Sequence, residues 1–379
     1  MHDYADQLYE RQQSGLLRRL RQLPKDVIDL ASNDYLYLAR NPEVIEAGIS
    51  TLKEFGAGGR ASRLVSGNLL PHQQLESVIA RFKHSDAALV FPSGYHANLS
   101  AVTALAQTGD FIFCDKRNHA SLIDACRLAS SQNIEVRYFG DLKKLENLLE
   151  STFTKHPDNY RFIVSDGVFS MDGDVADLPQ LLHLAEKYDA RILLDDAHGT
   201  GTLGATGRGT VEHFGLENHS RIIHIGTLSK AIGGQGGFVA ANQEIIDWLI
   251  NQARPFIYTT ALNPASCASA QKSFEIIERA PQMINQLRAI TQQLAHGLQE
   301  LGYSAILQPS PIIPVIIGEA QDALNLSNQL LQRGIWCPAI RPPTVPAGKS
   351  RLRLTANLSL TQEDITKVLS AFKSTFRNS

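Results

Sequence analysis

Residues 193–204 read LLDDAHGTGTLG, and residues 222–242 read IIHIGTLSKAIGGQGGFVAAN. Each segment continues an apolar run typical of a buried strand, and each run gives way to polar and small residues. In open α/β sheets, ligands bind in the crevice outside the carboxyl ends of the strands. We therefore expect Asp195 and Lys230, which follow the two runs, to face one such crevice.

Lys230 has neighbours that suit a reactive amine. It lies in the loop GTLSKAIGGQGG at 226–237, directly after the second run. Partial desolvation lowers the pKa of an amine, and small neighbours let a flat ligand approach. A lysine in a glycine-rich loop is nevertheless more often a solvated surface charge. This stretch alone leaves Schiff-base chemistry and a surface lysine both open.

Asp195 is the matching acid. Pyridoxal 5'-phosphate (PLP) needs an anion near its ring nitrogen, because the protonated ring is what makes it an electron sink. A carboxylate at the end of a strand could fill that role, although an aspartate there is often only the N-cap of the next helix. Lys230 and Asp195 together form a far more specific pattern than either residue alone.

Composition excludes several classes of protein. The 379 residues carry 36 basic and 38 acidic side chains, so a net charge of −2 favours neither nucleic acid nor anionic membranes as partners. The four cysteines form no CxxC pair, which argues against structural zinc and fits a reducing cytoplasm. The polar start MHDYADQLYERQQSG does not resemble a signal peptide, and no apolar run approaches the roughly 18 residues of a membrane span. We expect a cytoplasmic protein without a bound metal.

Strand-like and helix-like segments alternate through the first two thirds of the chain. This alternation predicts an α/β fold, with a mainly parallel sheet covered by helices. We expect an N-terminal helix and arm over 1–40, a large domain over 41–263 and a small α+β domain over 264–379. The first helix should span 3–23, a turn and strand should occupy 254–262, and a short strand should lie within 334–339. Strands of the large sheet are expected at 87–91, 111–114, 136–139, 162–165, 192–194, 222–225 and 238–241.

The spacing Asp195-x-x-His198, then Thr227-x-x-Lys230 with glycines following, resembles the signature of the α-oxoamine synthases. These are fold-type-I PLP-dependent transferases. SNDYL at 32–36, DGVFSMDGD at 166–174 and RLRLT at 351–355 are also similar to family motifs, so the resemblance spans nearly the whole chain. It implies a PLP enzyme whose small-molecule substrates are an amino acid and an acyl thioester.

The resemblance also implies roles for single residues. Lys230, His119 and Asp195 would be catalytic, with the His119 ring stacked on the cofactor. Segment 254–262 would reach the neighbouring subunit of a homodimer. Cofactor binding is implied for Gly94, Tyr95, His119, Ser170, Asp195, His198, Thr227 and Lys230, and substrate binding for Arg18, Asn33, Thr344 and Arg353.

Three further positions depend on the same resemblance. Arg60 and Arg63 lie in a glycine-rich loop where they could attract the phosphates of coenzyme A by charge-assisted hydrogen bonds. Asp166 would replace the glutamate of the family. Tyr37 stands where the family has glycine, so the local backbone or pocket could differ.

The sequence IRPPTVPAG at 340–348 is most similar to one branch of the family. That branch, which serves the biotin pathway, joins L-alanine to a pimeloyl thioester and releases carbon dioxide and a thiol, either coenzyme A or a carrier protein. Glycine-using relatives, such as glycine C-acetyltransferase and 5-aminolevulinate synthase, usually carry a tyrosine–proline pair here and remain the first alternative. A noncatalytic scaffold or a regulator on the same fold is the alternative from another class.

Overall fold

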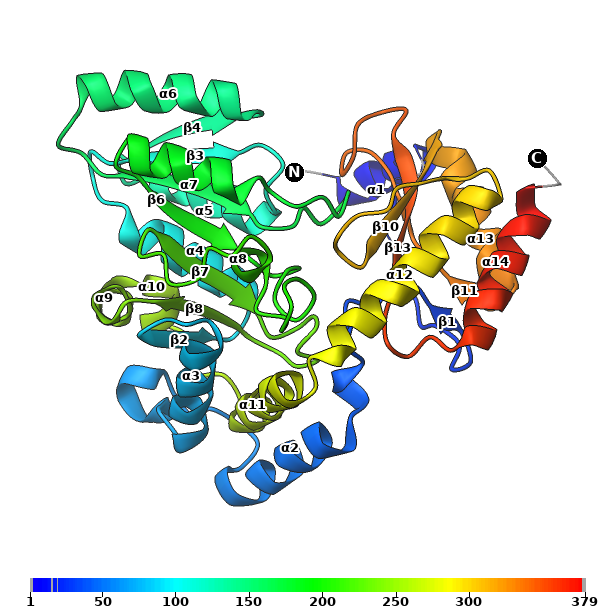
Figure 1. Cartoon of the computed structure of the whole chain (residues 1–379), viewed down its shortest axis with the longest axis horizontal. Helices are drawn as coiled ribbons and strands as arrows, with labels where there is room; N and C mark the ends of the chain where they lie inside the picture. Colours follow the sequence, from blue (N-terminus) through cyan, green and yellow to red (C-terminus); the bar gives the residue numbers. More distant parts are fainter. Residues whose placement is uncertain (1–2, 15, 19, 377–379) are drawn as a thin grey trace.

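A seven-stranded sheet forms the middle of the larger lobe, on the left in Figure 1, of the computed structural model, which describes residues 3–14, 16–18 and 20–376. All neighbouring strands are parallel except at β8, which runs antiparallel to both of its neighbours. The expected mainly parallel seven-stranded sheet is confirmed. In spatial order the strands are β2 (Ala87–Phe91), β8 (Gly237–Ala241), β7 (Ile222–Thr227), β6 (Arg191–Asp195), β5 (Arg161–Asp166), β3 (Phe111–Asp115) and β4 (Glu135–Phe139).

Successive side chains of these strands enter different hydrophobic cores on the two faces of the sheet. In β6, Leu193 belongs to one core, and Ile192 and Leu194 belong to another. Burial on both faces explains why the strands read as continuous apolar runs. The first core includes α4 (Gly94–Leu105), α5 (Ala120–Ser130) and α9 (Gln243–Gln252), and the second includes α6 (Leu142–Lys155) and α7 (Leu178–Lys187).

The C-terminal elements form a smaller α+β layer beside the large sheet (Figure 1). Two long helices, α11 (Pro264–Arg279) and α12 (Gln282–Glu300), lead into it and separate at Pro281, as the proline predicts. Near its start, the chain packs α2 (Pro42–Phe55) and α3 (Leu70–Phe82) against α11. The four-stranded antiparallel sheet has the order β12 (Ala339–Ile340), β13 (Ser350–Thr355), β10 (Ile312–Gly318) and β9 (Ser304–Ala305), and its helices are α13 (Ala320–Gln332) and α14 (Gln362–Phe376).

Two expectations near prolines were wrong. The strand within 334–339 is split, because β11 (Ile335–Trp336) pairs with β1 (Ile28–Asp29) while β12 joins the other sheet. Pro338 lies between them and has no N–H to continue a ladder. The turn and strand at 254–262 is instead the short helix α10 (Arg254–Ile257), which has a proline in its first turn, where a fixed φ favours helix.

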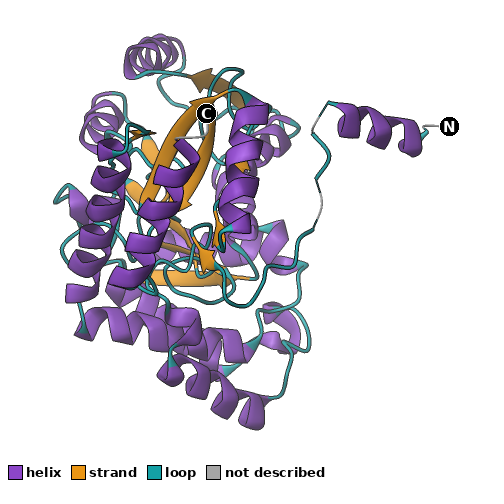
Figure 2. Cartoon of the chain, turned by 90° about the vertical axis from the view of Figure 1, so that its right-hand side faces the viewer, coloured by secondary structure: helices purple, strands orange, loops and turns teal. Residues whose placement is uncertain are grey.

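The N-terminal helix is shorter than expected. It is α1 (Tyr4–Gln13), and the hydroxyl of Ser14 donates to the carbonyls of Glu10 and Arg11 at its end. None of the side chains of α1 is buried, so tertiary packing does not stabilise a longer helix that would continue toward residue 23. Figure 2 shows α1 standing off from the other elements at the end of an extended segment. Within the described parts of the chain, no helix is both long and apolar enough to cross a membrane.

Candidate active site

A cavity of about 240 Å³ opens at the carboxyl ends of β5, β6 and β7, and we call it the central cavity. Asp166 ends β5 and pairs in register with Asp195, which ends β6. Parallel strands thus bring the two carboxylates to one edge of the sheet. All eight residues expected to bind the cofactor line this cavity: Gly94, Tyr95, His119, Ser170, Asp195, His198, Thr227 and Lys230.

Asp195 is buried and held in one orientation. Its Oδ2 accepts a hydrogen bond from Asn98 Nδ2 at 2.7 Å, and its Oδ1 accepts from the backbone N–H of Ala197 at 3.0 Å. Asn98, on α4, is also buried, and its own Oδ1 has no hydrogen-bond partner. A ligand that supplies an N–H donor or a positive charge would complement this side of the cavity.

Asp166 lies beside Asp195 and has an unusual environment. Its Oδ2 accepts from the backbone N–H of His119 at 3.0 Å, while its Oδ1 is buried without a partner. Burial, followed by the neighbouring charge of Asp195, raises the pKa of Asp166 well above its ordinary value. A carboxyl in such surroundings holds its proton more readily than an isolated one does.

Lys230 follows β7 on a loop that its own hydrogen bonds make rigid. The N–H of Gly233 donates to the carbonyl of Lys230 at 2.8 Å, and the Thr227 hydroxyl donates to the carbonyl of Gly236 at 3.0 Å. Gly233 has a φ of +69°, and an added Cβ would lie 2.4 Å from the nitrogen of Ala39, so only glycine fits. The sequence GTLSKAIGG thus positions the lysine beside the cavity.

Burial lowers the pKa of Lys230 to about 8. The carboxylates of Asp195 and Asp166 oppose this shift, and the guanidinium of Arg353 adds to it. An amine with this pKa is partly unprotonated near neutral pH, as a nucleophile toward an aldehyde must be.

The two histidines of the cavity are held by neighbouring hydroxyls. His119 Nδ1 lies 2.7 Å from Ser121 Oγ, and His198 Nδ1 lies 2.7 Å from the hydroxyl of Tyr35. Burial lowers the pKa of His119 and lowers that of His198 well below its usual range. Both rings are therefore neutral near pH 7.

An anion site lies at the start of α4. Ser93 caps this helix by accepting from the backbone N–H of His96 at 3.2 Å. The N–H groups of Gly94 and Tyr95 precede it in the first turn, where the helix itself offers no acceptor, and they could bind a ligand. Gly94 faces Thr227 so closely that an added Cβ would lie 3.1 Å from the threonine Cβ. The hydroxyls of Thr227 and Ser229 lie 2.8 Å apart beside it. Such a cradle suits a phosphate group.

The four residues expected to bind substrate do not all meet. Arg353 is buried on β13, where its Nε donates to the carbonyl of Ser170 at 2.6 Å and its two terminal nitrogens lie 3.4 and 3.5 Å from Asn33 Oδ1. Asn33 and Arg353 are therefore adjacent, and Arg353 contacts Ser170, which lines the central cavity. None of the four residues lines the cavity itself, and Thr344 and Arg18 are exposed.

Comparison with known proteins shows the family to which the chain belongs. A model of the family "Aminotransferase class I and II" matches residues 25–372. The chain belongs to this family. It is 42% identical to 8-amino-7-oxononanoate synthase 2 of Bacillus subtilis strain 168, over 97% of this chain and 96% of the relative. It is also 42% identical to 8-amino-7-oxononanoate synthase of Lysinibacillus sphaericus, over 96% of this chain and 95% of the relative.

A solved structure of the same fold contains the expected cofactor. It is a variant of serine palmitoyltransferase from S. paucimobilis with a bound PLP–myriocin aldimine, 29% identical to this chain, with a TM-score of 0.90 and coverage of 99% of this chain and 96% of that one. The central cavity of this family member fits PLP on its own residues. It combines a lysine amine, a buried carboxylate, unpartnered buried acceptors and an anion cradle.

The structure also adds a residue that sequence reasoning missed. Lys83, directly after α3, forms a fully buried ion pair with Asp196, in which Nζ and Oδ2 lie 2.9 Å apart. The same Nζ donates to Thr200 Oγ1 at 2.7 Å and to the carbonyl of Arg208 at 2.6 Å. This junction of Lys83 with Asp196, Thr200 and Arg208 holds the turn 195–200, in which Asp195 and His198 face the central cavity. In the sequence, only the second aspartate of DDAH, Asp196, indicated such a contact, because Lys83 lies 113 positions away from it.

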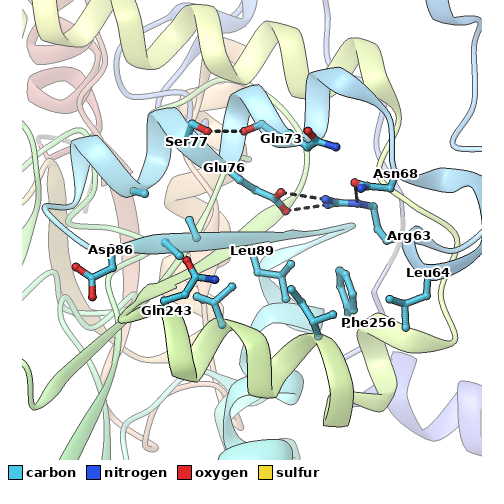
Figure 3. Close-up of a pocket in the computed structure, with 15 residues that line it drawn as sticks. Arg63, Leu64, Asn68, Gln73, Glu76, Ser77, Asp86, Leu89, Gln243 and Phe256 are labelled. Carbon is cyan, nitrogen blue, oxygen red and sulfur yellow. Dashed lines mark hydrogen bonds and ion pairs between the residues drawn. The ribbon is translucent and has the colours of Figure 1, made fainter.

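The loop expected to attract coenzyme A has a different arrangement. Arg63 donates to both carboxylate oxygens of Glu76, at 2.8 and 2.9 Å, so its charge is already neutralised. The pair lines a second, larger cavity of about 410 Å³ beside α3, β2 and α9 (Figure 3). None of the eight residues expected to bind the cofactor, or of the four expected to bind substrate, lines this second cavity. Arg60 is exposed and donates to the carbonyl of Phe55. Arg63 is therefore poorly suited to bind phosphate.

Tyr37, which stands where the family has glycine, has a backbone conformation typical of glycine. Its φ is +56° and its ψ is +32°, which is the left-handed conformation that glycine adopts most easily. The side chain is 42% exposed, so it does not crowd the core. The backbone at Tyr37 therefore keeps the conformation that a glycine would adopt. A tyrosine is strained in this conformation, because its Cβ disfavours a positive φ.

Proposed function

We propose that the chain is a PLP-dependent 8-amino-7-oxononanoate synthase. It would condense L-alanine with a pimeloyl thioester and release carbon dioxide and a free thiol. The observation that carries the proposal is the central cavity, in which Lys230, Asp195 and His119 converge while Arg353 contacts Ser170 of its lining. Relatives named for this activity, 42% identical over nearly the full length, support the choice of substrates.

PLP, when bound, would supply an electron sink for negative charge at the α-carbon of the amino acid. Lys230 would hold its aldehyde covalently and, once displaced by alanine, would take the α-proton on its amine. Asp195, fixed by Asn98, would hold the proton on the ring nitrogen. His119 would lie against the ring and orient the substrate carboxylate.

Substrate recognition would depend on residues beside the cavity. Arg353 has a guanidinium that can bind a carboxylate in a bidentate manner, and the alanine carboxylate would replace its weak contacts with Asn33. Thr344 and Arg18 are exposed, whereas Arg353 is buried beside Ser170, and we propose that Thr344 and Arg18 contact the acyl chain or thioester rather than the amino acid. The acyl carrier could be coenzyme A or a carrier protein.

We also propose a homodimer in the cytoplasm. The segment 254–262, which would reach the partner's cofactor, exposes 72% of Tyr258, as an unpaired interface residue would. All four cysteines are free and buried, which suits a reducing compartment. We further propose that residues 1–40, 41–263 and 264–379 are the arm, the large domain and the small domain.

Thiol release by the purified, PLP-loaded protein tests the proposal. L-alanine and glycine should each be combined with pimeloyl and acetyl thioesters, with Lys230→Ala as the control. We expect release only with alanine and the pimeloyl thioester, together with a product of the mass of 8-amino-7-oxononanoate. Preference for glycine and acetyl would assign a sister activity, and no release from any pair would favour a noncatalytic role.

A further inference from the structure

Tyr35 connects two parts of the site without lining the central cavity. It is fully buried in the N-terminal segment after β1. Its hydroxyl oxygen lies 2.7 Å from His198 Nδ1 and 3.1 Å from Asn33 Oδ1. His198 faces the cavity, whereas Asn33 contacts Arg353. The phenol is thus shared between the cofactor side and the substrate side.

Counting hydrogens decides how the phenol is used. A tyrosine hydroxyl has one hydrogen, so its contacts with His198 Nδ1 and Asn33 Oδ1 compete for it. Asn33 Oδ1 has other donors, because the Arg353 guanidinium carries only N–H groups and lies within 3.5 Å. An imidazole nitrogen is also a stronger base than an amide oxygen, and its contact is the shorter one. The hydrogen therefore belongs on the bond to His198.

The state of His198 follows from that bond. Its ring is neutral, because burial and the positive charges of Lys230 and Arg353 lower its pKa well below the ordinary value. A neutral imidazole carries one hydrogen, and Nδ1 is accepting from Tyr35. The hydrogen must then reside on Nε2, the ring nitrogen that remains for the cavity.

We propose that Tyr35 is a positioning residue that fixes His198 as the Nε2–H tautomer, so that this histidine offers a hydrogen-bond donor to the central cavity. The consequence for catalysis rests on the proposed function, in which the donor would face the phenolic oxygen of PLP. Tyr35 would act only through His198, since it does not line the cavity.

Tyr35→Phe tests the inference, because it deletes one hydroxyl and keeps the buried ring. Tyr303→Phe is the matched control, since the Tyr303 hydroxyl donates to the carbonyl of Phe372 in the C-terminal layer. The full chain would be labelled with ¹⁵N-histidine and studied without added cofactor, and the His198 signals would be assigned by their absence from His198→Gln.

We expect the wild type and Tyr303→Phe to show a protonated Nε2 and an unprotonated Nδ1 at His198. Tyr35→Phe should lose the hydrogen bond at Nδ1, so the Nδ1 resonance should move downfield, toward that of a free unprotonated nitrogen, and a share of the Nδ1–H form should appear. A wild-type His198 with Nδ1–H would overturn the proposal, and so would a Tyr35→Phe spectrum identical to that of the wild type at both ring nitrogens. This experiment does not require PLP, so its result is independent of the proposed function.

PLP binding gives the second readout. Tyr35→Phe should weaken PLP binding by about 2- to 12-fold, the size of one hydrogen bond, and shift the absorbance of the bound cofactor, while Tyr303→Phe changes neither. An unchanged PLP affinity and spectrum, with the expected tautomer shift, would refute the link from His198 to the cofactor. Failure of the wild type to bind PLP would instead refute the proposed function.

Discussion

Replacing Lys83 by methionine is expected to destabilise the fold and to loosen the turn that carries Asp195 and His198. The substitution keeps most of the buried volume and removes the charge that faces Asp196. Lys83 and Asp196 have side chains that are 1% and 0% exposed, so water cannot replace the lost partner. An aspartate would remain buried with its charge uncompensated.

The size of the effect follows from burial. Removing one partner of a buried ion pair costs about 3–5 kcal/mol of unfolding free energy, because the other charge stays desolvated. The matched control is Arg81→Met, in the last turn of α3, two residues before Lys83. Arg81 Nη2 lies 2.8 Å from Glu278 Oε2, but the two side chains are 58% and 26% exposed. An exposed ion pair of this kind is worth about 0–1 kcal/mol.

Urea unfolding of the protein, followed by circular dichroism, measures both losses. Lys83→Met/Asp196→Asn should recover about 2 kcal/mol, because asparagine keeps an oxygen for the two hydrogen bonds from Thr210 and leaves no buried charge. Lys83→Met should also release PLP faster than the wild type does. Our account of this junction fails if Lys83→Met costs no more than Arg81→Met, or if the second substitution adds to the loss.

Three other predictions concern the site itself. The rate at which the apoprotein binds PLP covalently should rise with pH up to about 8 and level off above it, because only the neutral amine of Lys230 reacts; a rise that continues toward 10.5 would indicate an ordinary lysine. Asp195→Asn should retain PLP but reduce turnover by roughly 100-fold or more, and wild-type turnover would disprove the electron-sink role. Arg353→Lys should raise the KM for L-alanine by about 10-fold with the PLP spectrum unchanged, and an unchanged KM would remove Arg353 from carboxylate binding.

The sheet could be predicted closely because its signal is local. Most strands of the large sheet are apolar runs bounded by polar or turn residues, so β2 is predicted to the residue, and β6 differs by one residue at each end. An exception is β4, which reads EVRYF. The rule that ligands bind at the carboxyl ends of strands then brings Asp195 and Lys230 together. That rule uses the order of elements along the chain, which the sequence contains directly.

The rest depends on contacts between distant residues. Asn98 and Lys83 are polar residues in ordinary segments, and Tyr35 lies in the motif SNDYL, but only the folded chain reveals that all three are buried beside the site. Their partners lie 97, 113 and 163 positions away. The exposure of α1 and the pairing of Arg63 with Glu76 likewise depend on packing, which periodicity does not describe.

Locating the covalent bond to PLP tests the central claim most directly. The PLP-loaded protein would be reduced with borohydride and digested, and the modified peptide would be identified by mass spectrometry. We predict one pyridoxyl group, on Lys230, and none in Lys230→Ala. A label on another lysine, or an unlabelled Lys230 in an active protein, would contradict the account.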